Sequence, residues 1–217
     1  MFIPIGDENP TERKPFVNYA FIAANIVCFV LQAMSTPAST IRWTMIPAHL
    51  DPVTVFTSMF LHADLFHLLF NMLFLWIFGD NVEDRLGHIG YVVFYFFCGI
   101  AAAGAHIAGD PTSELPTLGA SGAVSGVMGA YIVFYPRHHV KTFVWIFIFA
   151  GVIRTPAFLW LGIWFFQQVI YNLALPRGGG GGVARGCARP GDSVRGEGDG
   201  VGRGVAGCRG RCAKRRR

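Results

Sequence analysis

Residues 89–108 read IGYVVFYFFCGIAAAGAHIA, twenty consecutive residues without Asp, Glu, Lys or Arg. A helix needs about 20 mostly apolar residues to cross the hydrocarbon layer of a membrane. This stretch therefore predicts a membrane-spanning helix, and four other segments have a comparable character. The five predicted spans cover residues 16–34, 55–78, 89–108, 118–135 and 156–175.

One further apolar stretch, residues 143–153, is too short to be another span, and we interpret it as an interfacial or re-entrant piece. The composition agrees with a membrane protein. Of the 217 residues, 53% are hydrophobic and 14% are charged, whereas soluble domains have about 25% charged residues. The predicted fold class is an all-α polytopic membrane protein with about five spans.

The charge of the chain changes sign at Pro176. Residues 1–176 hold 7 Lys and Arg against 10 Asp and Glu, a net charge of −3, whereas residues 177–217 hold 11 against 3, a net charge of +8. The second part also lacks Leu, Ile, Phe, Trp, Tyr and Met, so we expect it to form neither a core nor a span. The predicted organisation is a cytoplasmic segment (1–15), a transmembrane domain (16–176) and a Gly/Arg-rich tail that is disordered or read out of frame.

Basic residues predict the orientation, because short cytoplasmic loops are enriched in Lys and Arg. If the N-terminus is cytoplasmic, the outer side collects Arg42 alone before the tail begins. The cytoplasmic side then collects Arg13, Lys14, Arg85, Arg137, Lys141 and Arg154. We therefore expect a multi-pass protein of a bacterial inner or plasma membrane. Five spans would put the basic tail on the outer face, against the same rule.

Polar side chains inside predicted spans indicate candidate functional sites, since they are costly to bury in lipid. In FLHADLFHLLFN, residues 60–71, His67 and Asn71 lie four residues apart and share one face of a helix. These two side chains can donate hydrogen bonds to a developing negative charge, and His62 lies close by in the sequence. The alternative is that all three join neighbouring helices as polar contacts.

A run of small residues, LGASGAVSG at 118–126, begins the fourth predicted span. Gly122 and Gly126 form a GxxxG pattern, which is typical of close helix packing and needs no catalysis. The second and fourth spans both enter from the outer face, however, so Ser121 can lie near His67 and Asn71. A hydroxyl beside two potential oxyanion donors resembles half of a serine hydrolase site.

Four motifs give the chain a family resemblance. They are GASG at 119–122, His62-xxxx-His67-xxx-Asn71, Gly79-xxx-Glu83-xxx-Gly87 and YPR at 135–137. In combination they make most of residues 16–176 resemble the rhomboid family of intramembrane serine proteases. The resemblance implies six core helices and a Ser-His dyad in a water-accessible cavity that opens to the outer side.

By this resemblance, Ser121 is the nucleophile, and its backbone N–H forms the oxyanion hole with the side chains of His67 and Asn71. The residues implied to have structural roles are Gly119, Gly122 and Glu83. The aromatic fifth span, which contains Trp160 and Trp164, resembles a substrate gate, although interfacial anchoring explains it equally well. The implied reaction cuts transmembrane protein substrates within the lipid bilayer, with no metal, no cofactor and no nucleic-acid partner.

The resemblance fails at the general base, which the family places on its sixth helix. The seven histidines of this chain are His49, His62, His67, His88, His106, His138 and His139. None follows residue 139, so no dyad histidine is found for Ser121. We interpret the Gly-, Arg- and Cys-rich stretch that begins near residue 183 as a slip of the reading frame. The alternative is a genuine basic tail that binds anionic lipid or nucleic acid.

The predicted function is intramembrane proteolysis of rhomboid type near the outer membrane boundary, inactive in this sequence because the sixth-helix histidine is missing. The alternative is a non-catalytic rhomboid-like protein that binds transmembrane helices. A transporter or channel subunit is disfavoured, since Asp64 is the single charged residue inside a predicted span.

Overall fold

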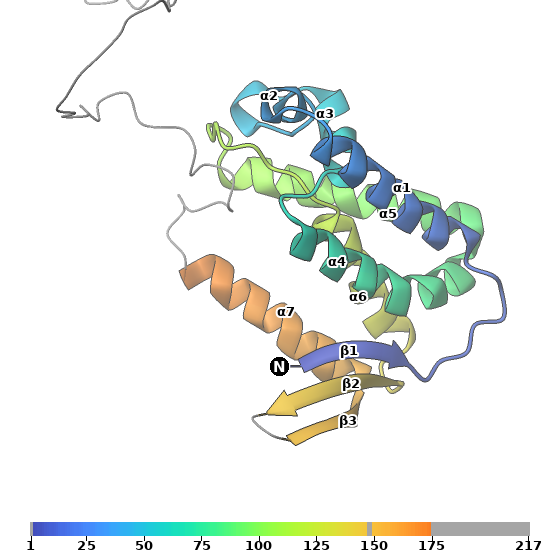
Figure 1. Ribbon diagram of the computed structural model, residues 1–217. Coiled ribbons are helices and arrows are strands. Elements are labelled where there is room, and N and C mark those ends of the chain that lie inside the picture. The colour runs from blue at the N-terminus through green and yellow to red at the C-terminus, as the bar shows by residue number, and fades with distance from the viewer. Residues whose placement is uncertain (1, 147–148, 175–217) are drawn as a thin grey trace, which may run out of the picture. The chain divides into compact units, whose positions relative to one another are not determined.

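The computed structural model describes residues 2–146 and 149–174, which are mostly helical (Figure 1). The helices are α1 Phe16–Ala33, α2 Pro37–Ile41, α3 Pro52–Thr57, α4 Leu65–Phe74, α5 Asp80–Gly109, α6 Ser121–Phe134 and α7 Ala157–Ala174. Shorter helical turns are η1 Pro47–His49, η2 Ser58–Phe60 and the π-helical η3 Leu75–Gly79. The predicted tail, with its proposed change of reading frame, lies outside the described residues.

Within the part of the chain that the structure describes, two helical runs are long and apolar enough to cross a membrane. They are Phe16–Ala33 and the continuous run Leu65–Gly109, whereas Ser121–Phe134 and Ala157–Gln167 are shorter apolar helices. Gly87 interrupts the long run with a φ of 73°, a left-handed conformation that glycine adopts without strain. The count of five spans stays a prediction.

The second predicted span, residues 55–78, is not one helix. Its first part forms the short elements α3 and η2, and α4 begins only after Asp64. The Asp64 carboxylate accepts a hydrogen bond of 2.8 Å from the backbone N–H of His67, which caps the helix at this point. The cap fixes His67 in the first turn of α4.

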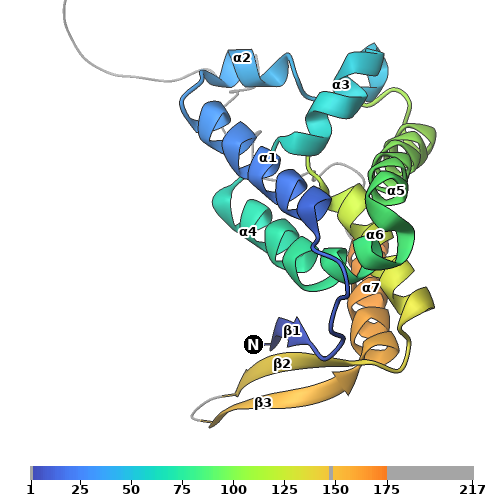
Figure 2. The same cartoon turned by 90° about the vertical axis from the view of Figure 1, so that its right-hand side faces the viewer.

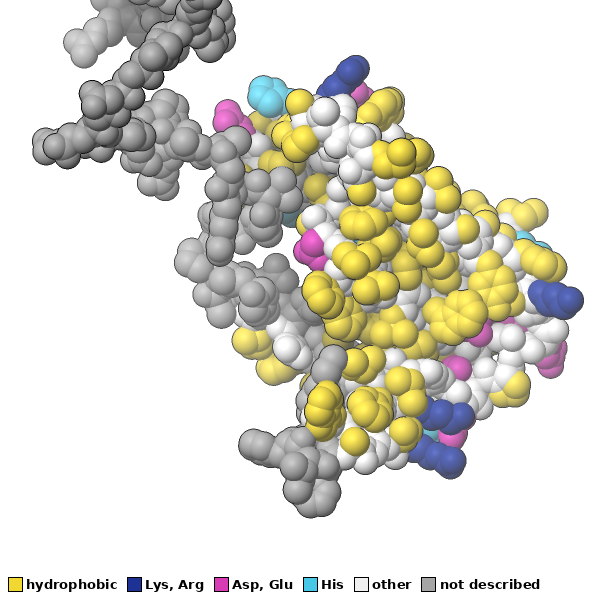
Figure 3. All heavy atoms as spheres, viewed as in Figure 1, with side chains coloured by type: hydrophobic (Ala, Val, Ile, Leu, Met, Phe, Trp, Pro, Cys, Tyr) yellow, Lys and Arg dark blue, Asp and Glu magenta, His cyan; other side chains and the backbone are white. Residues whose placement is uncertain are grey.

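Apolar side chains cover much of the molecular surface over α1 and α4 (Figure 3). Phe66, Trp76, Ile89 and Phe97 are between 61% and 83% exposed. Charged side chains lie toward the ends of this apolar face rather than within it. Such a large exposed apolar area is typical of a surface that faces lipid.

A three-stranded antiparallel sheet corrects the all-α prediction. Strand β1 (Phe2–Asp7) pairs with β2 (His139–Ile146), which pairs with β3 (Phe149–Pro156) (Figures 1 and 2). Val140 and Thr142 on β2 are buried while Trp145 is exposed, which is the two-residue alternation of a strand. The apolar stretch 143–153, predicted as an interfacial or re-entrant piece, therefore belongs to a hairpin whose partner strand comes from the other end of the chain.

Helices α5 and α6 approach closely through glycines. A Cβ atom added at Gly122 would lie under 3.0 Å from the Ala102 side chain, and one at Gly126 would lie under 3.0 Å from the Cys98 side chain. Small residues allow this approach because two helix backbones can meet only where no side chain separates them. The contact fixes α6, and with it Ser121, against α5.

Replacing Gly126 by alanine should lower the free energy of unfolding by about 1–3 kcal/mol, because the new methyl group has no room beside Cys98. Gly129→Ala is the matched control on the same helix, since nothing lies within 4 Å of its added Cβ. The control should leave stability unchanged or raise it by up to about 1 kcal/mol. The midpoint of unfolding by sodium dodecyl sulfate measures both, and equal midpoints would contradict the close approach of α5 and α6.

A buried polar network ties the start of α1 to the start of α5. The Glu83 carboxylate, which is 1% exposed, accepts hydrogen bonds from the backbone N–H groups of Val17 at 3.0 Å and Asn18 at 2.7 Å. The Asn18 side chain in turn donates to the carbonyl of Leu75 at 2.8 Å and accepts from the Tyr91 hydroxyl at 2.9 Å. Glu83 thus supplies acceptors for N–H groups that a helix start cannot satisfy by itself.

We expect Glu83→Ala to lower the free energy of unfolding by about 2–4 kcal/mol, because one buried and one partly buried N–H group lose their acceptor. Asp84→Ala is the matched control. Its carboxylate accepts from the backbone of Glu12 and Arg13 in an exposed setting, where loss should cost about 1 kcal/mol or less. Thermal unfolding in lipid nanodiscs tests the pair, and similar losses for both variants would show that Glu83 is not a buried cap.

Candidate functional site

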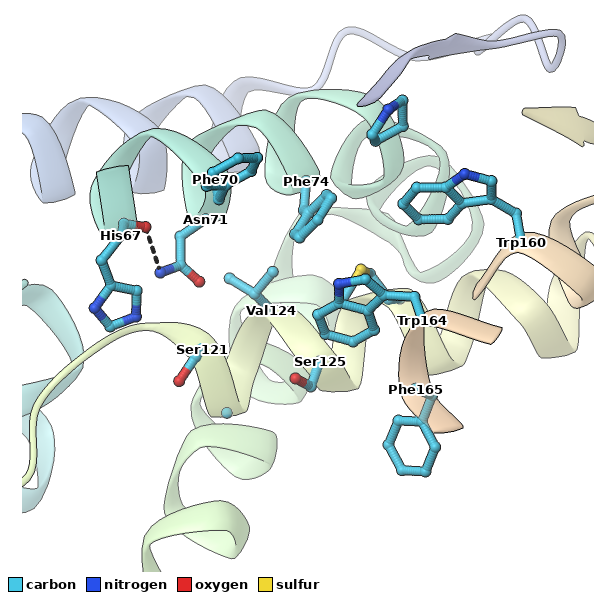
Figure 4. A pocket seen from close by; sticks show the side chains of 13 residues that line it. His67, Phe70, Asn71, Phe74, Ser121, Val124, Ser125, Trp160, Trp164 and Phe165 are labelled. Carbon is cyan, nitrogen blue, oxygen red and sulfur yellow. Dashed lines mark hydrogen bonds between the residues drawn. The ribbon is translucent and has the colours of Figure 1, made fainter. Parts of the chain in front are cut away.

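Side chains from α4, α6 and α7 line a cavity of about 650 Å³ (Figure 4). His67, Asn71 and Ser121 lie at one end of it, and Trp160 lies at the other. The remaining lining residues are Pro4, Phe70, Phe74, Gly122, Val124, Ser125, Met128, Trp164 and Phe165. The three residues predicted as nucleophile and oxyanion donors therefore share one cavity, although their catalytic roles stay predictions.

Ser121 is the first residue of α6. The N–H groups in the first turn of a helix have no partner within it, so the Ser121 N–H is a potential donor. The segment before it is held by the backbone: Thr117 exchanges two hydrogen bonds with Met45, at 2.7 and 3.1 Å, and the Gly119 N–H donates to the Ser58 carbonyl at 2.8 Å. These bonds fix the turn from which Ser121 projects.

Both the backbone conformation at residue 119 and the atoms around it require a glycine at this position. Its φ of +128° is a conformation that side chains rarely allow. A Cβ atom at this position would lie 2.8 Å from His67 Cε1 and 3.7 Å from Ser121 Oγ. Ser121 and His67 therefore flank the space that the absent side chain leaves, which gives the GASG motif a physical reason.

His67 and Asn71 follow one another along the face of α4 that lines the cavity. The Asn71 amide nitrogen donates a hydrogen bond of 2.9 Å to the His67 carbonyl, one turn earlier in the same helix. In this state the amide group is held by its own helix and not by Ser121. The bond uses one of the two N–H groups on this nitrogen, and the second N–H can serve a ligand in the cavity.

His62 does not line the cavity but packs behind His67. It is fully buried, its ring centroid lies 5.3 Å from that of His67 in an edge-on arrangement, and neither ring nitrogen has a hydrogen-bond partner among the described residues. Gln32 holds its backbone with bonds of 2.6 and 3.1 Å. Across residues 2–146 and 149–174 no group of three His, Cys, Asp or Glu residues could hold a metal ion.

The aromatic residues of α7 close one side of the cavity. The ring centroids of Trp164 and Trp160 lie 5.5 and 6.2 Å from that of Phe74 on α4, both edge-on. Phe165 also lines the cavity, whereas Phe166 is 66% exposed. Aromatic rings in the first half of α7 thus contact α4.

Sequence reasoning missed Pro4 as a cavity residue, and no signal near residue 4 indicates it. His106 lines a second, smaller cavity of about 190 Å³ that Ser121 lines too, and its Nε2 is 2.9 Å from the Thr117 hydroxyl. Ser121 therefore lines two cavities, one that His67 also lines and one that His106 also lines.

Comparison with known proteins identifies the family of the chain. The family model of the Rhomboid domain matches residues 49–186. A relative from Bacillus subtilis, "Rhomboid protease GluP", is 33% identical over 127 residues, which cover 55% of this chain and 24% of that protein. "Rhomboid protein 1, mitochondrial" from Saccharomyces cerevisiae is 30% identical over 126 residues, covering 56% of this chain and 34% of that protein.

A shorter match links residues of this chain to "Rhomboid protease GlpG" of Salmonella typhi, with 33% identity over 82 residues that cover 35% of this chain and 29% of that protein. The matches thus span between 24% and 34% of the length of these relatives. The family model covers well over half of the chain, including the cavity residues of α4, α6 and α7. The chain belongs to the rhomboid family, whose proteases are multi-pass membrane hydrolases.

Proposed function

We propose that this chain carries the site of an intramembrane serine protease, with Ser121 as nucleophile and with the Ser121 N–H, His67 and Asn71 as oxyanion donors. One observation carries the proposal. The three side chains line the same cavity, and Gly119 leaves open the space between Ser121 and His67. The substrate would be a transmembrane protein cut near the outer boundary of the bilayer, with the N-terminus of this chain on the cytoplasmic side.

The proposed chemistry begins with loss of the Ser121 hydroxyl proton and attack of Oγ on the carbonyl carbon of a peptide bond. The carbonyl oxygen becomes negative, and donors aimed at it stabilise this charge strongly in a site that excludes water. Collapse of the intermediate breaks the C–N bond, protonates the departing amine and leaves an ester on Ser121. Water then hydrolyses the ester and restores the hydroxyl.

The step without an assigned residue is the removal of the proton. Since no histidine follows residue 139, the sequence lacks the base that the family places on its sixth helix. Losing such a group costs about 10⁴- to 10⁶-fold in turnover in other serine proteases. We therefore propose that this chain turns over substrate very slowly or not at all, although Ser121 and its oxyanion donors are present.

A fluorophosphonate probe tests the nucleophile. It forms a phosphorus–oxygen bond to an accessible serine and releases fluoride, and at pH 9 hydroxide can replace the missing base. We expect slow labelling that Ser121→Ala abolishes. Ser125→Ala is the matched control, because Ser125 lines the same cavity one turn later on α6, and it should leave the labelling unchanged. Labelling that survives Ser121→Ala would contradict the assignment of the nucleophile.

A second candidate is a non-catalytic protein that binds transmembrane helices, which the missing histidine favours. The two candidates differ in what they need from Ser121. Retention of a photo-crosslinkable transmembrane peptide, with no Ser121 labelling at any pH, would support the binding role. Labelling of Ser121 in the same preparation would support the protease.

The tail bears on this choice. The composition changes near residue 183, and the match to the rhomboid domain ends at residue 186. We propose that the reading frame slips there. Sequencing the gene from the codon of Pro176 and translating all three forward frames would reveal an apolar span with a histidine if the slip is real. Absence of such a span from every frame would favour the binding role.

A further inference from the structure

One wall of the cavity beside Ser121 comes from the N-terminal strand of the chain. Pro4, on strand β1, is buried and lines the cavity together with residues of α4, α6 and α7. Strand β1 contacts η3, which directly follows α4. His67 lies in the first turn of α4, whereas η3 follows the last turn of that helix. Pro4 is on the strand that contacts η3, so it lies toward the end of the cavity opposite His67, which we call the far end.

Antiparallel pairing with β2 holds strand β1 in place. Ile3 pairs with Phe143 and Pro4 with Thr142, and the register shifts between Pro4 and Gly6. Ile5 is the residue at this irregularity, and it is 51% exposed. Proline is tolerated because β1 is an edge strand of the sheet (Figures 1 and 2).

The end of β1 is anchored to the helix that carries Ser121. The Asp7 carboxylate accepts hydrogen bonds from the Tyr131 hydroxyl of α6 at 2.7 Å and from the Asn81 side chain of α5 at 2.8 Å. Burial raises the pKa of Asp7, and the bond from Tyr131 opposes that shift. Glu8 also pairs with Arg154 of β3 at 3.1 Å. The wall is therefore tied to α5, α6 and the hairpin together.

The two ends of the cavity differ in polarity. His67, Asn71 and Ser121 make one end polar, whereas Phe74 and Trp160 make the far end apolar. A ligand that fits both ends carries one polar, reactive group and an apolar chain beyond it. An extended apolar segment of a membrane protein has this character, with the amide to be cut at Ser121.

The lining of α6 gives the available length. It runs from Ser121 to Met128, about 10 Å at 1.5 Å per residue of helix. An extended chain advances about 3.3 Å per residue, so about three substrate residues fit along this lining.

We propose that Pro4 is a specificity-determining residue: it closes the far end of the cavity and limits the apolar substrate segment beyond Ser121 to a few residues. This inference rests on the proposed function, since it assumes that the ligand reacts at Ser121. It adds that the length of that segment is set by the N-terminal strand and not by the three helices alone.

Two alkyl fluorophosphonates, ethyl and dodecyl, test the wall on the full chain in nanodiscs. Pro4→Trp should reduce the ratio of dodecyl to ethyl labelling by at least about 10-fold, the effect of excluding roughly two methylenes from an apolar site. Pro4→Gly should raise the same ratio. Ile5→Trp is the matched control, because it adds the same ring to the exposed neighbour, and it should leave the ratio within about twofold of the parent.

A second readout does not depend on the reactivity of Ser121. The fluorine signal of 5-fluorotryptophan at Trp164 should shift when unreactive dodecylphosphonate is added, and Pro4→Trp should abolish the shift while Ile5→Trp keeps it. If neither probe labels the parent but this pattern holds, the wall stands and the proposed nucleophile fails. If Pro4→Trp and Ile5→Trp behave alike in both readouts, Pro4 does not bound the cavity and the proposal is overturned.

Discussion

The absence of a side chain at residue 119 is the constraint on which the site depends. Ser121 and His67 flank the point where a Cβ atom would stand, 3.7 Å from Oγ and 2.8 Å from the ring. The backbone conformation that makes this possible is itself open mainly to glycine. Hydrogen bonds from Gly119 and Thr117 to the segment between α1 and α4 then hold the turn against the bundle. Larger residues here would separate the two side chains before any chemistry could begin.

The cavity also depends on polar contacts at the opposite ends of the helices. Glu83 satisfies the start of α1, and Asp7 links β1 to α5 and α6. Both carboxylates accept hydrogen bonds that apolar surroundings would otherwise leave unmade. These contacts set the positions of α1, α5, α6 and β1 relative to one another, and so the shape of the cavity follows in part from residues that do not touch its polar end.

Sequence alone predicted the apolar helical segments and the family, because apolar stretches and closely spaced motifs are local signals. It joined α3, η2 and α4 into one span, since apolar content does not reveal that η2 ends at Phe60 and that a new helix begins after Asp64. It missed the sheet because β1 and β2 are far apart in the sequence, and apolar patterning cannot tell which distant strand will pair. Pro4 became part of the candidate site through that pairing, so no local pattern could have indicated it.

The hydrogen bond from Asn71 to the carbonyl of His67 has a consequence for selectivity between states of the reaction. One N–H of the Asn71 amide is bound to the helix at 2.9 Å, which holds the second N–H in a fixed direction, and a neutral substrate carbonyl that meets this N–H gains one ordinary hydrogen bond. An oxygen that carries a full negative charge gains more, since charge-assisted bonds are about twice as strong as neutral ones. Under the proposed mechanism, Asn71 would therefore discriminate in favour of the transition state over the bound ground state, and this difference alone is what accelerates a chemical step.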